Sequence, residues 1–145
     1  MKRSTPHSKI VAMSERDVST VARHYQDGLA LTARGDWFEA HEAFETAWRT
    51  CGADERDFFQ GLVHVVVSAY QRERGKPVAQ ESQRQKGLRR LAAFEPTHRG
   101  LDVAALRAAL GRSEPDLRKH LVQAVAQPGV AVEEEQEPER DEGRA

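Results

Sequence analysis

Two side chains in the middle of the chain have the types and spacing of metal ligands. His41 is followed directly by Glu42 and, four positions on, by Glu45, so the segment has the pattern H-E-x-x-E. In the zinc motif H-E-x-x-H, two histidines four residues apart on a helix bind one ion. A carboxylate can also ligate zinc, manganese or iron. His41 and Glu45 are therefore candidate ligands of a divalent metal such as zinc or manganese, and Glu42 or Glu45 is a candidate general base.

A third ligand would have to come from the following helix. His64 lies on a narrow stripe of that helix whose members are small or polar: Asp57, Gln60, Gly61, His64, Ser68 and Gln71. If this stripe faces the H-E-x-x-E helix, His64 completes a metal site with His41 and Glu45, because helical bundles build such sites from inward Glu and His side chains. If it does not, His64 is a solvent-exposed histidine.

Two interpretations of the same residues do not involve a metal. His41 falls in the centre of an aromatic stripe formed with Trp37, Phe44 and Trp48, where a buried histidine needs a hydrogen-bond partner such as Glu45 or Gln60. The region is alternatively a small-ligand pocket, with these residues as its lining: His41, Glu42, Glu45, Trp48, Gln60, Gly61 and His64.

The glycine at position 61 supports either a pocket or close packing. A glycine inside a helix costs about 1 kcal/mol relative to alanine. Something must compensate at Gly61, either a neighbouring helix at close range or a ligand lying against the backbone.

Helical periodicity positions all of these residues. Apolar side chains at i, i+3, i+4 and i+7 predict helices over residues 15–34, 37–51, 54–74 and 77–94, with Ser14 and Asp36 as N-caps. After a loop at residues 96–100, two short helices are expected from Asp102 and Ser113. The fold class is therefore all-α, a single helical bundle of four main helices plus one or two short C-terminal helices.

Composition limits the chain to one domain with polar ends. The 145 residues contain 39% hydrophobic residues and carry a formal net charge of −1, which suffices for one modest core. We expect a disordered basic N-terminus at 1–13, the helical-bundle domain at 14–127 and a disordered acidic tail at 128–145.

Several classes of protein fit the sequence poorly. No apolar run is long enough for a membrane span or a secretory signal. Cys51 is the single cysteine, which favours a reducing, cytoplasmic compartment. The basic stretch at 72–95 lacks interleaved exposed aromatics, so it indicates a solvated helix face rather than a nucleic-acid site. His24, His98 and His120 are expected at the surface.

Two motifs together resemble a known family. Phe38, His41, Glu42, Glu45 and Trp48 match F-x-x-H-E-x-x-E-x-x-W, and the segment that begins at Phe58 matches F-x-Q-G-L. This combination resembles the bacterial domain-of-unknown-function 309 family. The resemblance implies an all-helical fold and no known activity, and the fourth helix fits the family pattern poorly.

A second resemblance concerns the first two helices. Residues 28–48 are similar to one tetratricopeptide repeat, which would imply a non-catalytic protein-interaction module. A stable array needs at least three copies, and the following segment lacks the pattern. The sequence thus leaves the partner open, either a second copy or another protein.

Overall fold

The computed structural model describes residues 13–121, and the termini discussed above lie outside the described residues. Its elements are α1 (Glu15–Ala33), α2 (Trp37–Thr50), the 3-10 turn η2 (Ala53–Glu55), α3 (Arg56–Glu73), α4 (Pro77–Leu91), the 3-10 turn η3 (Ala92–Phe94), β1 (Thr97–His98), β2 (Leu101–Asp102) and α5 (Val103–Gly111). The predicted all-α class and its four main helices are confirmed.

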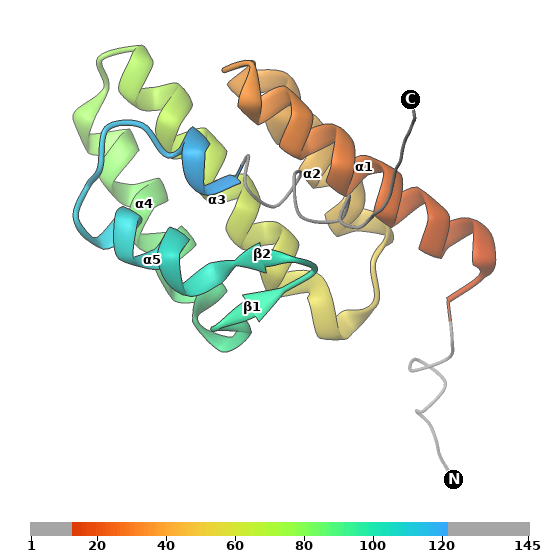
Figure 1. The fold of residues 1–145 in the computed structure, drawn as a ribbon. Coiled ribbons are helices and arrows are strands. Elements are labelled where there is room, and N and C mark those ends of the chain that lie inside the picture. The colour runs from red at the N-terminus through yellow and green to blue at the C-terminus, as the bar shows by residue number, and fades with distance from the viewer. Residues whose placement is uncertain (1–12, 122–145) are drawn as a thin grey trace, which may run out of the picture.

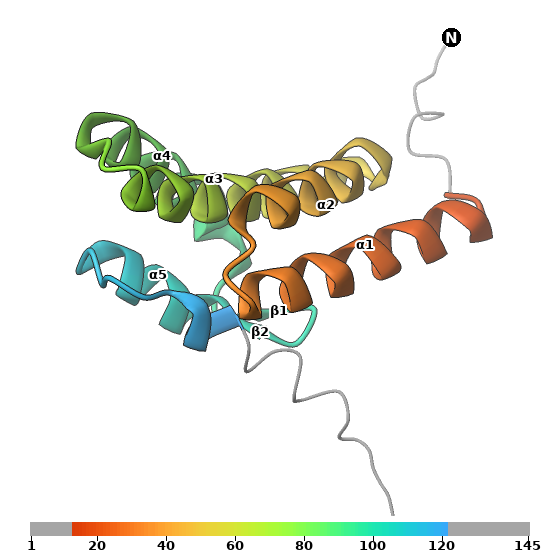
Figure 2. The ribbon, with the colours of Figure 1, turned by 90° about the horizontal axis from the view of Figure 1, so that it is seen from above.

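The helices form two layers (Figure 1, Figure 2). In Figure 2, α2, α3 and α4 lie beside one another in one layer, and α1, the β1–β2 hairpin and α5 form the other. Consecutive main helices run antiparallel because the turns between them are short. Gly35 and Gly75 occupy the left-handed region there, with φ of 77° and 69°, which only glycine adopts at no steric cost.

The core lies between the layers. Phe44 of α2 and Phe58, Phe59 and Leu62 of α3 are completely buried, and Tyr25 of α1 packs against the three phenylalanine rings. The layer of α2, α3 and α4 therefore has one face on the core and one face that no described element covers.

Two boundaries differ from the sequence-based expectation, and one cap agrees with it. The loop predicted at 96–100 contains a two-residue antiparallel hairpin that pairs Thr97 with Asp102 and His98 with Leu101. The predicted helix after Ser113 begins only at residue 118, because Ser113 has a φ of 55° and cannot serve as an N-cap. Asp102 caps α5 as predicted, accepting a hydrogen bond from the Ala105 amide at 2.9 Å.

Candidate functional site: the outer face of the three-helix layer

Three members of the small and polar stripe of α3, Asp57, Gly61 and His64, pack against α4. A side chain at Gly61 would meet Leu91 Cγ at 2.7 Å, so α4 crosses α3 directly over this glycine. His64 Nδ1 lies 2.7 Å from Gln83 Oε1, and Arg90 donates to Asp57 Oδ1 at 2.8 Å. The interpretation of Gly61 as a point of close helix packing is therefore the one that the structure supports.

The three predicted metal ligands do not come together. His41 Nε2 lies 3.8 Å from Glu45 Oε2, and Glu45 also lies 3.3 Å from Arg49, but His64 faces Gln83 of α4. Within residues 13–121 no group of three His, Cys, Asp or Glu side chains is placed to hold a metal ion. The expected site is not assembled because His64 faces α4 instead of α2.

The remaining residues of the predicted pocket are spread along the same layer. Glu42 is exposed on α2, and Gln60 is half-buried on α3. Trp48 is half-buried beneath the guanidinium of Arg56, which lies 5.4 Å from its ring centroid. Its indole Nε1 is buried and has no hydrogen-bond partner among the described residues. These residues and His41 therefore do not line one shared cavity.

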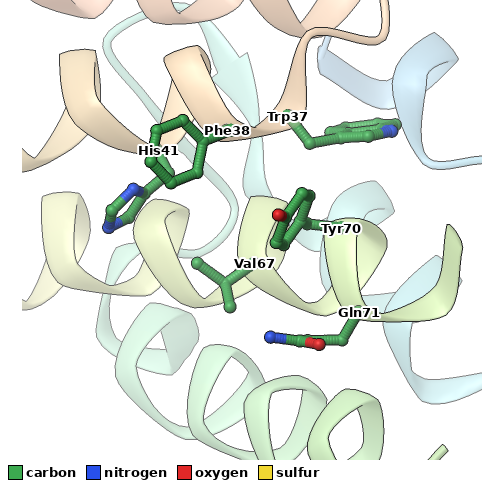
Figure 3. Close-up of a pocket in the computed structure, with 6 residues that line it drawn as sticks. All are labelled: Trp37, Phe38, His41, Val67, Tyr70 and Gln71. Carbon is green, nitrogen blue, oxygen red and sulfur yellow. The ribbon is translucent and has the colours of Figure 1, made fainter. Parts of the chain in front are cut away.

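A hollow of about 200 Å³ lies between α2 and α3 (Figure 3). Its lining residues are Trp37, Phe38, His41, Val67, Tyr70 and Gln71. The Phe38 side chain is 53% exposed, and its ring centroid lies 5.8 Å from that of His41 and 6.0 Å from that of Tyr70. Of the seven residues predicted for the pocket, only His41 borders this hollow.

One polar atom of the hollow has no partner. Gln71 Oε1 is buried, and no hydrogen-bond donor reaches it from the part of the chain that the structure describes. A buried acceptor left in this state costs about 1–3 kcal/mol. A bound partner that supplies an N–H or O–H group there would remove that cost.

Opposite charges lie on α2 and α4, the two helices that neighbour α3. On α2, Glu39, Glu42 and Glu45 are accompanied by the single cation Arg49. On α4, only Glu81 accompanies the cations Arg84, Lys86, Arg89 and Arg90. We call this surface the α2–α4 face, defined by Phe38, His41, Glu42 and Glu45 of α2, Gln60, Val63, Val67 and Gln71 of α3, and Lys86, Arg89 and Arg90 of α4.

The pKa of His64 is affected by the charges on the basic side of this face. Burial lowers the pKa of the imidazole, the hydrogen bond with Gln83 opposes that shift, and the nearby charges of Arg90, Lys86 and Arg89 lower the pKa further. His64 is therefore neutral at pH 7 and adds no charge to the basic side.

A second polar cluster holds the β1–β2 hairpin on the other layer, and sequence analysis missed it. Glu55 accepts hydrogen bonds from Arg99 Nε at 2.6 Å and Arg99 Nη2 at 2.9 Å, and its Oε2 lies 2.8 Å from His98 Nε2. The Tyr25 hydroxyl donates to the Arg99 carbonyl at 3.1 Å.

His98 also packs on the rings of Phe58 and Phe94, so the prediction that it is a surface residue was wrong. We call Glu55, His98, Arg99 and Tyr25 the clasp.

The single cysteine lies close to the clasp and is not activated. Burial, with the Glu55 carboxylate as the second cause, raises the pKa of the Cys51 thiol to about 11. The thiol therefore stays protonated at neutral pH and is a poor nucleophile.

The fold and the α2–α4 face define a small, two-layered all-α domain with an apolar surface between two flanks of opposite charge. Residues 25–82 match the family model described as Domain of unknown function (DUF309), and the resemblance expected from the sequence motifs is thereby confirmed. The match extends from the middle of α1 into α4 and includes the hollow. No curated protein and no solved structure gives a significant match. None of the described helices has the length and apolar composition that a membrane crossing requires.

Proposed function

We propose that the chain is a non-catalytic protein-interaction domain that docks a protein partner on its α2–α4 face. The observation that carries the proposal is the hollow beside the exposed ring of Phe38, in which Gln71 Oε1 lacks a donor. Exposed aromatic rings next to a cavity are typical of the anchor points of protein interfaces.

The size of the hollow favours a side chain of a protein over a free ligand. Small-molecule sites usually measure about 300–1,000 Å³ and enclose most of the ligand. A half-open hollow of about 200 Å³ is smaller and accommodates one side chain. The predicted small-ligand pocket of His41, Glu45 and Gln60 has less support, because these residues do not share a cavity.

The charges of the face favour a protein over a nucleic acid. A nucleic-acid surface is basic throughout, whereas this face carries Glu42 and Glu45 on one flank and Lys86 and Arg89 on the other. A reducing compartment such as the cytoplasm suits a chain whose lone cysteine has no intrachain partner.

Selection from a displayed library of random short peptides tests the proposal. We expect the enriched peptides to bind the native chain and to lose at least about tenfold in affinity, equivalent to 1.4 kcal/mol, against Phe38→Ser. The matched control is Val18→Ser on α1, because the Val18 side chain is also 53% exposed but lies on the other layer. Peptides that bind Phe38→Ser as well as they bind the native chain would exclude the α2–α4 face as the docking surface.

A further inference from the structure

We propose that the partner docked on the α2–α4 face is a second copy of this chain, related by a two-fold axis that runs along α3. This inference rests on the proposed function, and it adds both the identity of the partner and the geometry of the complex. Three independent features of the face support it: the spacing of side chains on α3, the order of charges across the layer, and the chemistry of Gln71.

The outward stripe of α3 has the spacing that pairs two helices. Gln60, Val63, Val67, Tyr70 and Arg74 follow one another at alternating intervals of three and four residues, which is the spacing of the contact positions in paired helices. All except Arg74 are half-buried, although no described element packs over the outer face. An apolar seam of this kind is buried when an identical seam packs against it.

The order of charges selects one of the two possible two-fold axes. An axis in the plane of the face but perpendicular to the helices would place α2 over α2, and would therefore oppose carboxylates with carboxylates. An axis along α3 places α2 of each copy over α4 of the other. Glu42 and Glu45 then face Lys86 and Arg89 of the second copy, and each of these contacts occurs twice.

The charges also match in height along the helices. Trp48, near the end of α2, lies beside Arg56 at the start of α3. Gly87, in the second half of α4, lies beside Gly61 and His64 in the first half of α3. The acidic part of α2 and the basic part of α4 therefore flank the same half of α3, so the rotation about α3 brings them into register.

The primary amide of Gln71 can form hydrogen bonds with an identical amide across a two-fold axis. It lies on the outer side of α3 near the proposed axis, and its buried Oε1 lacks a donor within the described residues. A primary amide carries both an acceptor and two donors. If both amides turn toward the axis, two Gln71 side chains can exchange hydrogen bonds, each Oε1 accepting from the Nε2 of the second copy.

The area of the face is adequate for a specific dimer. Three helices of about 15 residues, spaced about 9 Å apart, present a face of roughly 600 Å² in projection. Specific interfaces bury about 800 Å² of accessible surface on each partner, and accessible surface exceeds projected area.

Sedimentation analysis of the full chain with charge-reversed variants tests this arrangement. We expect the native chain to be a dimer at micromolar concentrations. Glu42→Lys with Glu45→Lys should be monomeric because it opposes cations with cations, and Lys86→Glu with Arg89→Glu should be monomeric because it opposes carboxylates with carboxylates. An equimolar mixture of the two variants should form a one-to-one heterodimer, because both of its flanks again pair opposite charges.

The controls separate this inference from a folding defect and from the proposed function. Asp27→Lys reverses one exposed charge on α1 of the other layer and should remain dimeric. Recovery of the heterodimer shows that both variants are folded. A native chain that is monomeric at all concentrations, or variants that dimerise separately as well as they do together, would overturn the two-fold arrangement. Selected peptides that bind a monomeric chain through Phe38 would leave the proposed function standing and refute only the second copy as partner.

Discussion

The clasp and the α2–α4 face are both polar clusters set among aromatic rings, but their hydrogen bonding differs. In the clasp, both carboxylate oxygens of Glu55 accept hydrogen bonds from Arg99, and the Tyr25 hydroxyl has an acceptor. On the face, Gln71 Oε1 and Arg90 Nε are buried without partners among the described residues. A cluster whose polar atoms all have hydrogen-bond partners stabilises the fold. A cluster with unpartnered acceptors and donors gains those hydrogen bonds when a partner protein binds. The following predictions test this contrast by mutating residues of each cluster.

The largest loss of stability is expected from the clasp. Glu55→Ala leaves the half-buried guanidinium of Arg99 without its acceptor, and should lower the free energy of unfolding by about 2–4 kcal/mol. The matched variant on the face, Glu45→Ala, should change it by less than about 0.5 kcal/mol, because its ion pair with Arg49 is exposed. Urea denaturation measures both, and equal effects would remove the distinction between the clusters.

The clasp should also give the chain a specific dependence on pH. The hydrogen bond from Arg99 is the main cause that holds the pKa of Glu55 below its ordinary value of 4.5. A carboxyl with a lowered pKa in the folded state stabilises the fold above its unfolded pKa, and this stability is lost as the pH falls through the folded value. The stability advantage of the native chain over Glu55→Gln should therefore be full at neutral pH and shrink below pH 4.5. An advantage that is constant with pH would contradict the role of the ionised carboxylate.

A smaller effect is expected where α3 and α4 cross. In Gly61→Ala the new methyl group meets Leu91, and overpacking of about 1–3 kcal/mol should exceed the gain of about 1 kcal/mol in helix propensity. The matched control is Gly111→Ala at the end of α5, where a Cβ would contact nothing within 4 Å and a slight stabilisation is expected. Denaturation midpoints of the two variants should move in opposite directions, and a stabilised Gly61→Ala would show that α4 does not press on this glycine.

The helices were predictable from the sequence because apolar spacing and caps are local signals. The aromatic stripe around His41, the Gly61 packing point and the Asp102 cap each follow from spacing within a single helix. What local spacing cannot give is which helix covers which stripe. The polar stripe of α3 was expected to face α2 in the metal-site hypothesis, and its members Gly61 and His64 face α4 instead.

The clasp was missed for the same reason. Glu55 lies 43 positions from His98 and 44 from Arg99, so no periodic pattern links them. The hollow was also missed, because Gln71 was assigned to the polar stripe of its helix rather than to one surface with Phe38. Gly100 is a turn signal in the sequence, but the positive φ of Arg99 beside it is visible only in the structure.

His64 gives a smaller test of the basic flank. Because burial and the cations Arg90, Lys86 and Arg89 lower its pKa, NMR titration should place the imidazole below its ordinary value of 6.5. Lys86→Ala and Arg89→Ala should raise the pKa, and Gln83→Leu should lower it, since that variant removes the hydrogen bond that opposes the shift. Because the pKa of His64 is lowered in the folded state, its contribution to the free energy of unfolding is full above pH 6.5 and is lost as the pH falls through the folded-state pKa. A pKa that does not respond to Lys86 or Arg89 would place those charges away from His64.

The smallest effect on folding is expected at the most exposed ring of the face. Phe38→Ser removes a side chain that is half in solvent, so the free energy of unfolding should stay within about 0.5 kcal/mol of the native value. The same substitution should weaken self-association at least about tenfold, because the Phe38 ring borders the hollow together with Tyr70. Denaturation and sedimentation of one preparation measure both quantities. Val18→Ser, with equal exposure on α1, should change neither. A Phe38→Ser chain that is destabilised as strongly as Glu55→Ala would mean that the ring supports the fold in the same way as the clasp, and the contrast between the two clusters would then fail.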